Sequence, residues 1–195
     1  VSLSSSDEPE AGDAITLFQG GSFHGGLAGT GAGEFEASVT HMGRSSVRVQ
    51  VGAHHAIERE APREVHLLAG ITANERMDWL VEKATELGVA SITPLVAERS
   101  VLKLKGERAE KKLAHWQAVA VAACEQCGRN RVPVVHDAVD LAGWLRAQAP
   151  LPAQGTRLLR SLRTGTQALR TAGAGGGALI FLSGPEGGLS STEED

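Results

Sequence analysis

A glycine-rich loop near the end of the chain has the residue types of a small-ligand site. The apolar run Ala178–Leu182 is long enough for a buried strand, and the stretch Ser183–Leu189, with sequence Ser-Gly-Pro-Glu-Gly-Gly-Leu, must turn directly after it. Ser190 and Ser191 each precede a glutamate by three residues, so two overlapping capping boxes can start a helix. Glycines let a ligand approach the backbone, and a helix start offers unpaired N–H groups. The loop therefore predicts a ligand site, with a purely structural turn as the alternative.

The loop lacks two sequence patterns that are typical of nucleotide-binding loops, which restricts the ligands that it could bind. No Lys-Ser or Lys-Thr pair follows it, as in a Walker A loop, and the G-x-G-x-x-G spacing of dinucleotide folds is absent. A small ligand with an adenine-like hydrogen-bonding edge suits its backbone groups better than a triphosphate does.

A second polar stretch, Glu125–Arg131, ends a predicted helix at Gly128 and precedes a predicted strand. We expect this loop to face the same end of the sheet as the ligand. Its guanidinium and amide groups suit phosphates or the edge of a base: Gln126, Arg129, Asn130 and Arg131. The alternative is a helix C-terminal cap with favourable dipole charges.

The formal net charge of −4 conceals an uneven distribution of basic residues. Between Arg99 and Arg131 there are eight Lys or Arg against three acids, and from Arg146 to Arg170 there are five arginines and no acid. Such a local excess favours a phosphate-facing surface, with Arg99 and Lys103 among its residues. A solvated helix face that mixes Glu and Lys is the alternative.

Other ligand classes find little support. Cys124 and Cys127 fall late in a helical pattern without a second ligand pair, which favours packing over zinc or redox chemistry, and the histidines are scattered, so we predict no metal. No apolar stretch approaches the roughly 18 residues that span a bilayer. Since the stretch Val1–Glu8 also lacks a signal-peptide pattern, we expect a cytoplasmic protein with no membrane partner.

The chain that precedes these residues changes character near residue 61. We expect residues 1–11 to be poorly ordered. Residues 12–60 predict a small β-barrel of short strands with a Gly-rich loop over residues 20–33; its strands are Ala14–Phe18, Glu34–Thr40 and Val47–Val51.

Residues 61–195 alternate strands and helices, which predicts an α/β fold with a parallel sheet whose ligands lie at the carboxyl ends of the strands. The expected strands before the final one are Val65–Ile71, Ser91–Val96 and Val132–His136, and the expected helices are Asn74–Leu87, Glu107–Cys127 and Asp140–Ala149. The first helix is expected to bury one apolar face: Met77, Leu80, Val81, Ala84 and Leu87.

Four motifs, in this order and spacing, resemble the bacterial 16S ribosomal RNA uracil-N3 methyltransferases of the SPOUT class. The resemblance covers about residue 12 to the end and is carried by the stretches Glu82–Gly88, Ile92–Ser100, Ala123–Pro133 and Leu182–Ser190.

The resemblance implies a PUA-like, RNA-binding β-barrel over residues 12–60 and a SPOUT methyltransferase domain with a C-terminal trefoil knot over residues 61–195. It also implies a homodimer that transfers a methyl group from S-adenosylmethionine to N3 of a uridine in 16S ribosomal RNA of the 30S subunit. The implied cofactor-binding residues are Leu162, Arg163, Leu182, Ser183, Gly184, Pro185, Glu186, Gly187, Gly188 and Leu189. The resemblance also places Glu125, Gln126 and Arg129 on the RNA-facing side. Together with the basic residues noted above, the expected RNA-binding residues are Gln126, Asn130, Arg131, Arg99 and Lys103.

The implied catalytic residues are Arg129 and Glu125. Because the sulfonium is already a strong electrophile, the protein must mainly hold the methyl group in line with N3 and stabilise the uracil anion. Arg129 suits that stabilisation because a guanidinium stays protonated. Glu125 or Glu186 would serve as general base if burial raised its pKa, and either could instead bind a ligand or cap the loop.

Two differences from the family bear on these expectations. The family continues beyond the position of Asp195 through a Leu-Gly-x-Arg-x-Leu-Arg-x-Glu-Thr segment, so we expect an incomplete SPOUT domain with weak cofactor binding or none. Where the family has an arginine-bearing segment, Ser2–Glu10 stands here. Two other functions stay open: a non-catalytic RNA-binding or ribosome-assembly module of the same fold, and a SPOUT methyltransferase acting on transfer RNA.

Overall fold

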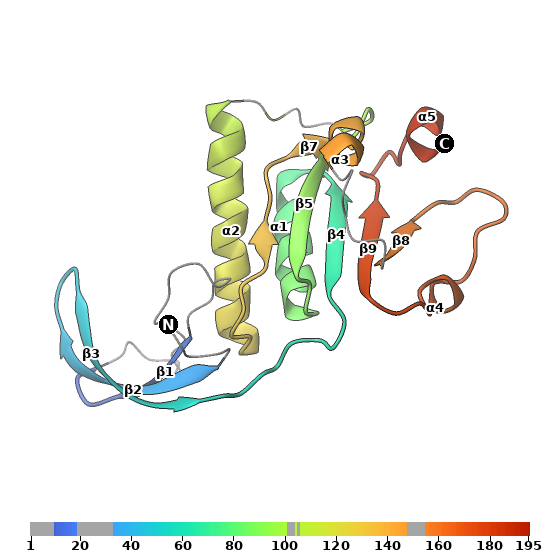
Figure 1. Cartoon of the computed structure of the whole chain (residues 1–195). Coiled ribbons are helices and arrows are strands. Elements are labelled where there is room, and N and C mark those ends of the chain that lie inside the picture. The colour runs from blue at the N-terminus through green and yellow to red at the C-terminus, as the bar shows by residue number, and fades with distance from the viewer. Residues whose placement is uncertain (1–9, 19–32, 101–103, 105, 148–154) are drawn as a thin grey trace. The chain divides into compact units, whose positions relative to one another are not determined.

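The computed structural model describes residues 10–18, 33–100, 104, 106–147 and 155–195 (Figure 1). Contacts divide the chain into a first unit, Val1–Glu60 with Val121–Val132, and a second unit, Ala61–Ala120 with Pro133–Asp195. Most of the predicted poorly ordered start, nearly all of the Gly-rich loop and the predicted RNA contact Lys103 lie outside the described residues.

The first unit contains a three-stranded antiparallel sheet in the order β1-β2-β3. Strand β1 spans Ala14–Phe18, β2 Glu34–Met42 and β3 Val47–His55, so all three predicted strands form and the last two are longer than expected. Side chains alternate between the two faces of a strand. One face therefore gathers a small apolar core: Ile15, Ala37 and Val39, with Leu17 and Val49 packed against them.

The second unit contains a parallel sheet in the order β6-β5-β4-β9-β8, with β7 paired to β5. This confirms the α/β class with a parallel sheet. The strand bounds are β4 Val65–Gly70, β5 Ser91–Val96, β6 Val134–Val135, β7 Val139–Asp140, β8 Gly155–Leu159 and β9 Ala178–Ser183.

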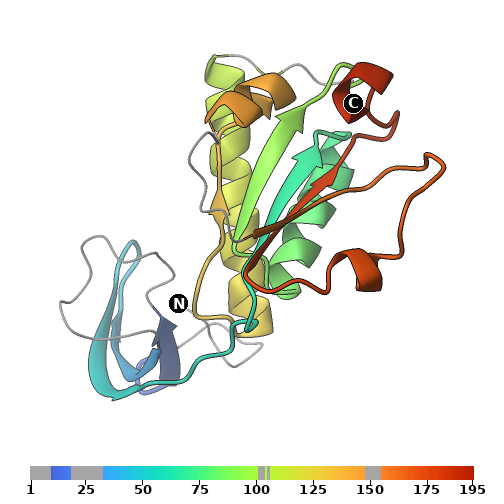
Figure 2. The same ribbon diagram turned by 45° about the vertical axis from the view of Figure 1, so that its right-hand side comes forward.

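Two long helices connect the first three strands of this sheet. Helix α1 spans Asn74–Glu86 and α2 spans Glu107–Cys127. Because both crossovers step in the same direction along the sheet, α1 and residues 107–120 of α2 lie on the same face (Figure 2). Three short helices follow: α3 Leu141–Ala147, α4 Leu169–Ala172 and α5 Ser191–Glu194.

The predicted burial of the apolar face of α1 is confirmed in the middle of the helix, but it is wrong at the C-terminal end. Met77 and Val81 have no exposed surface, whereas Leu87 is 85% exposed. Leu87 is the C-cap, and the chain turns away at Gly88, whose φ of 92° favours glycine. A residue past the last helical position no longer follows the helical period, so Leu87 leaves the buried face.

Within the described residues, no helix is both long enough and apolar enough to span a membrane.

Candidate functional site

The predicted ligand loop lies at the carboxyl edge of the parallel sheet. Strand β9 pairs with β4 up to Ser183, and the loop that follows passes directly over the end of β4. A Cβ atom added at Gly70 would lie 2.1 Å from the backbone nitrogen of Pro185, which is far inside van der Waals contact. The last residue of β4 must therefore be glycine for the loop to take this path.

The backbone of the loop is tightly turned and offers hydrogen-bond donors. Gly188, at a φ of 70°, donates its N–H to the Pro185 carbonyl at 2.8 Å. Within the described part of the chain, the backbone N–H groups of Glu186, Gly187 and Leu189 have no acceptor. Unsatisfied backbone donors beside glycines are suited to the acceptor atoms of a ligand.

An apolar cluster lies next to these donors. Leu189 is 5% exposed and packs with Leu95 and Ala97 at the end of β5, and Leu141 and Leu182 complete the cluster. An apolar wall with a few fixed polar groups is typical of a small-molecule site. The arrangement suits a flat, partly apolar ligand with a hydrogen-bonding edge.

Two arginines from neighbouring segments hold the loop in place. Arg76 of α1 forms an ion pair with Glu186, with 2.7 Å between Nη1 and Oε1. Arg99 donates from Nη1 to the Gly187 carbonyl at 3.0 Å. The sequence predicted an RNA-facing Arg99, whereas its observed contact is with the ligand loop. Arg76 was missed, although its position just after the end of β4 could have indicated it.

The helix after the loop is capped as predicted, and the cap satisfies two N–H groups at its start. Ser190 Oγ accepts from the Glu193 N–H at 3.3 Å, and Glu193 Oε2 accepts from the Ser190 N–H at 2.9 Å. The first of the two capping boxes is therefore confirmed. The expectation that this helix start presents unpaired donors is wrong for these two groups, since the capping box already satisfies them.

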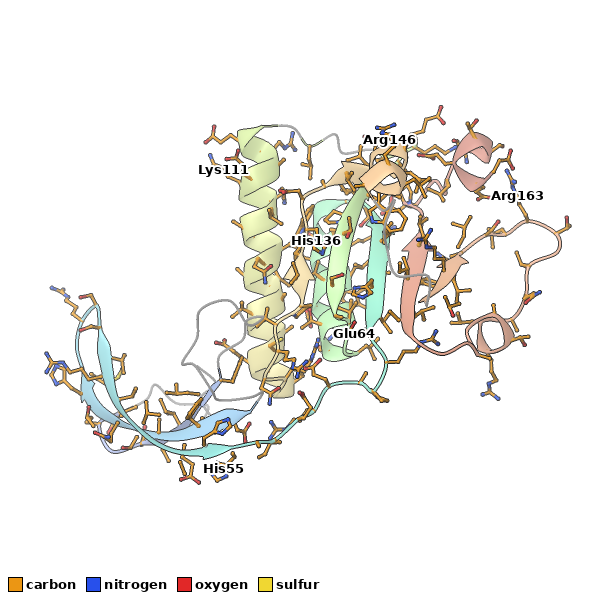
Figure 3. All side chains as sticks on the ribbon, in the orientation of Figure 1. His55, Glu64, Lys111, His136, Arg146 and Arg163 are labelled. Carbon is orange, nitrogen blue, oxygen red and sulfur yellow. The ribbon has the colours of Figure 1, made fainter. Side chains whose placement is uncertain are left out.

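The second predicted cofactor segment, Leu162 and Arg163, is tied to the same helix. Arg163 donates from Nη2 to the Ser191 carbonyl at 3.0 Å, and its Nε lies 2.8 Å from Glu194 Oε2 (Figure 3). The hydrogen bond that Arg163 donates to the Asp195 carboxylate is the main reason that the pKa of Arg163 is raised. The structure thus ties Arg163 to α5, the helix that directly follows the glycine loop, while Leu162 is 97% exposed.

One polar residue of this region was missed by the sequence reasoning. The hydroxyl of Thr72, two residues beyond β4, is buried and has no hydrogen-bond partner among the described residues. A buried hydroxyl without a partner costs free energy. Thr72 is therefore a further candidate for a ligand contact, and no local motif identifies it.

In the first unit, three consecutive predicted site residues bind the segment over residues 57–60. Arg129 is 5% exposed and donates from Nε to Glu60 Oε1 at 3.0 Å, and Nη2 contacts the other carboxylate oxygen. Asn130 Nδ2 donates to the Ile57 carbonyl at 2.6 Å, and Arg131 Nη2 lies 2.6 Å from Glu58 Oε2. These contacts hold Arg129 and Asn130 as buried side chains.

The remaining residues of this stretch differ in exposure. Gln126 is exposed and Glu125 is half-buried. Cys124 is buried, and desolvation raises the pKa of its thiol to about 11, so the packing prediction is confirmed for Cys124. Packing is wrong for Cys127, which is exposed because it lies on the outer side of the last helical turn.

The expected common orientation of the two predicted loops is wrong. Pro133 leads into β6 at the amino end of the parallel sheet, whereas Gly184 leaves β9 at the carboxyl end. A chain entering a parallel strand arrives at the edge opposite to the one from which a chain leaves. The loop before β6 therefore does not open onto the ligand's end of its own sheet.

Among the described residues, no group of three or more His, Cys, Asp or Glu could hold a metal ion.

Comparison with known proteins gives a consistent result. Residues 59–195 match the family model of the RNA methyltransferase domain. The protein named ribosomal RNA small subunit methyltransferase E of Bacillus subtilis is 32% identical over 139 residues, which are 69% of this chain and 54% of that protein. Its namesake in Mycobacterium tuberculosis is 28% identical over 169 residues, 86% of this chain and 64% of the relative. This chain spans about half the length of the first of these relatives and less than two thirds of the second.

A solved structure extends the similarity to the fold. The crystal structure of a ribosomal RNA small subunit methyltransferase E from Neisseria gonorrhoeae, bound to S-adenosyl methionine, matches with a TM-score of 0.79 and 31% identity. The match covers 95% of this chain and 71% of that one. The resemblance found in the four motifs is thereby confirmed. The chain belongs to the family of RNA methyltransferases that includes the small-subunit methyltransferase E proteins.

Proposed function

We propose that this protein is an S-adenosylmethionine-dependent methyltransferase that modifies N3 of a uridine in 16S ribosomal RNA of the small subunit. The observation that carries the proposal is the glycine loop, which is pressed onto Gly70 and directs unpaired backbone donors beside an apolar cluster. The names of the relatives and the S-adenosyl methionine bound to the Neisseria gonorrhoeae protein support it.

The residues of the carboxyl edge fit the proposed cofactor. The N–H groups of Glu186, Gly187 and Leu189 suit the acceptor atoms of an adenine edge, and half-buried Leu182 offers apolar contact to its ring. When bound, S-adenosylmethionine supplies a methyl group on a positively charged sulfur. The loop's part is to hold the ligand in one orientation, which Arg76 and Arg99 support by fixing Glu186 and Gly187.

Removal of the imide proton leaves negative charge on the uracil ring. We assign the stabilisation of this charge to Arg129, whose guanidinium is held by Glu60. Because the loop before β6 and the glycine loop lie at opposite edges of the parallel sheet, this assignment requires the proposed homodimer to bring Arg129 of one subunit to the ligand of the other. We assign the role of proton acceptor to Glu125. Glu186 is less suited to that role because its carboxylate is bound to Arg76.

The finer architecture belongs to the same proposal. We propose that the first unit is an RNA-binding, PUA-like β-barrel and that the second is a SPOUT domain with a trefoil knot, working as a homodimer. The three-stranded sheet and the parallel sheet support these assignments, as do the order and spacing of the four motifs.

The test is methyl transfer from labelled S-adenosylmethionine to 30S subunits, with free transfer RNA as the competing substrate, followed by nucleoside analysis. We expect labelled 3-methyluridine in the 30S reaction alone. Label in transfer RNA would favour the alternative substrate. Binding of 30S subunits with no transfer to either substrate would favour a non-catalytic module.

A variant series separates the assigned roles. Arg129→Ala should lower turnover more than cofactor binding, whereas Arg59→Ala, an arginine paired with Glu34 in the same unit, should leave turnover unchanged. Cofactor affinity is measured by calorimetry in parallel. Unchanged turnover of folded Arg129→Ala would remove the catalytic assignment.

A further inference from the structure

The β2–β3 hairpin carries its acidic residues, Glu34 and Glu36, only at the start of β2. Residues 37–57 contain no Asp or Glu, although the chain as a whole has a net charge of −4. The same stretch holds two arginines and three histidines: His41, Arg44, Arg48, His54 and His55. A local cationic surface on a protein of negative net charge attracts negatively charged ligands such as polyanions.

The end of this hairpin, residues 41–48, presents its cations to solvent; we call it the hairpin tip. His41 pairs with Arg48 across the strands, and the turn closes where the Gly43 N–H donates to the Ser46 carbonyl at 2.8 Å. Every residue of the hairpin tip is exposed. Within the described ranges, the guanidinium groups of Arg44 and Arg48 make neither an ion pair nor a hydrogen bond.

The hairpin tip has a defined shape. A β-bulge interrupts the register between Val39 and His41, and Thr40 Oγ1 donates to the Arg48 carbonyl at 3.1 Å. A bulge bends its strand and increases the local twist. The backbone that carries Arg48 is therefore fixed, so that little conformational freedom of the backbone is lost when a ligand binds.

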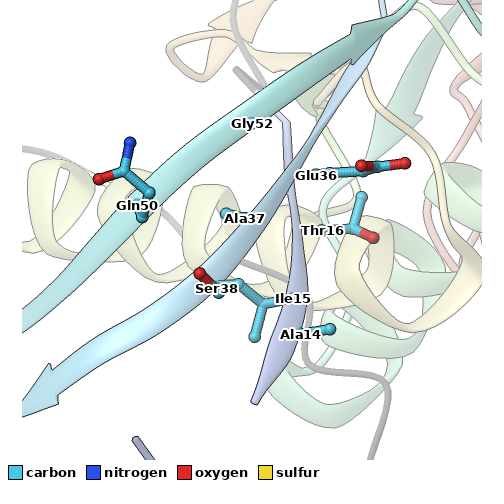
Figure 4. A pocket seen from close by; sticks show the side chains of 8 residues that line it. All are labelled: Ala14, Ile15, Thr16, Glu36, Ala37, Ser38, Gln50 and Gly52. Carbon is cyan, nitrogen blue, oxygen red and sulfur yellow. The ribbon is translucent and has the colours of Figure 1, made fainter. Parts of the chain in front are cut away.

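An open groove of about 500 Å³ crosses the same sheet (Figure 4). Its lining comes from all three strands: Ala14, Ile15, Thr16, Glu36, Ala37, Ser38, Gln50 and Gly52. Ile15 and Ala37 belong to the apolar core, and the others come from positions that alternate with the core residues. The extra residue of the bulge lies on β2, and residues 47–51 of β3 pair without an insertion. Arg48 therefore lies on the same face of β3 as Gln50, at the end of the groove nearer the hairpin tip.

The chemistry of the groove suits a sugar-phosphate backbone. Its floor is made of small residues, and Thr16, Ser38 and Gln50 offer hydroxyl and amide groups that bind phosphate and 2′-hydroxyl oxygens. None of the eight lining residues is aromatic, so the groove offers no stacking platform for bases. The one carboxylate, Glu36, is held by His55 at 2.7 Å.

We infer that the groove and the hairpin tip together bind the sugar-phosphate backbone of RNA, with Arg44 and Arg48 contacting phosphates. The inference rests on the proposed function for the choice of RNA. It assigns the contact to backbone rather than base recognition, so the site should tolerate changes of RNA sequence.

The test is the salt dependence of binding between the whole protein and a fluorescent single-stranded RNA from the small subunit. Each phosphate contact that is lost should lower the slope of log K against log salt concentration by about 0.7–1. We expect that loss for Arg44→Ala and for Arg48→Ala. The control Arg59→Ala should keep the wild-type slope, because its guanidinium already lies 2.7 Å from Glu34. Gln50→Ala should weaken binding about twofold or more without changing the slope, as expected for a neutral contact.

Thermal unfolding checks that each variant is folded, and methyl transfer is measured on the same samples. Unchanged slopes for both Arg44→Ala and Arg48→Ala would overturn the inference, as would the absence of salt-dependent RNA binding by the wild type. A wild type that methylates 30S subunits while the slopes stay unchanged leaves the proposed function intact. Slopes that fall as expected in a protein without transfer activity support the hairpin tip and count against the proposed function alone. Slope changes seen with anionic lipid vesicles but not with RNA would also overturn it.

Discussion

The two regions that hold the predicted site residues are built on opposite principles. In the glycine loop the groups available to a ligand are backbone N–H groups, and the side chains of Arg76 and Arg99 hold the backbone. In the stretch Arg129–Arg131 the functional groups are side chains, each held by a residue of the 57–60 segment. A local motif can specify the first kind of site by itself. The second kind depends on partners far away in the sequence.

Removing Arg129 should have the largest effect, because its partner is buried with it. The side chains of Arg129 and Glu60 are 6% and 15% exposed. Breaking such a pair from one side leaves an uncompensated buried charge, so Arg129→Ala should lower the free energy of unfolding by about 3–5 kcal/mol. Urea denaturation measures the change.

The neighbouring pair Arg131–Glu58 is the matched control. Its side chains are 53% and 41% exposed, so Arg131→Ala should cost about 1 kcal/mol or less. If both variants lowered the free energy of unfolding by the same amount, burial would not explain how strongly each ion pair contributes to stability. Glu60→Gln together with Arg129→Ala should recover part of the loss, because the buried carboxylate is then neutral.

Gly70→Ala tests whether the glycine loop is defined by its backbone. The added Cβ would lie 2.1 Å from the Pro185 nitrogen, so the loop must move, at a cost of about 1–3 kcal/mol of stability. We expect S-adenosylmethionine binding, measured by calorimetry, to weaken more than stability does. Gly176→Ala is the control, since an added Cβ there meets nothing within 4 Å. A Gly70→Ala variant with normal affinity would contradict the assigned position of the ligand.

Arg99→Ala separates the two roles available to that side chain. Because Arg99 binds the Gly187 carbonyl, its loss should reduce cofactor affinity several-fold, in line with one hydrogen bond of about 1 kcal/mol. The salt dependence of RNA binding should stay unchanged. Arg108→Ala, at an exposed position of α2, should change neither quantity. A reduced salt slope with normal cofactor affinity would return Arg99 to the RNA-facing role that the sequence predicted.

The sequence predicted the helices and strands whose apolar residues form a clear pattern, and it missed short elements that depend on contacts with a distant strand. The bounds of β1, β5 and α2 agree with the prediction, because their apolar residues recur at the period of a strand or a helix. Strand β8 was missed because Gly155–Leu159 is short and ends the sheet, with β9 as its partner. Helix α4 has only four residues.

The site residues follow the same division. The loop Ser183–Leu189 could be found because glycine and proline restrict the backbone wherever they occur. The importance of Gly70 could not, since its neighbour Pro185 is 115 positions away and only the register of β4 with β9 brings them together. The ion pair of Arg129 with Glu60 joins residues 69 positions apart. Tertiary contacts of this kind leave no local pattern.

The smallest expected effect on stability concerns Cys124 and Cys127. Both precede the stretch Arg129–Arg131, so their reactivity reports on that region. At pH 8 an alkylating reagent should modify exposed Cys127 within minutes, while Cys124, whose thiol has a pKa of about 11, should react only after unfolding. Because the folded state holds this thiol proton more tightly than the unfolded state, where the pKa is near 9, stability should fall as the pH rises from about 9 to 11. Cys124→Ser should remove that part of the pH dependence, with Cys127→Ser as the control. Mass spectrometry after labelling distinguishes the two sites, and rapid modification of Cys124 in the folded protein would show that this segment opens far more readily than its buried contacts predict.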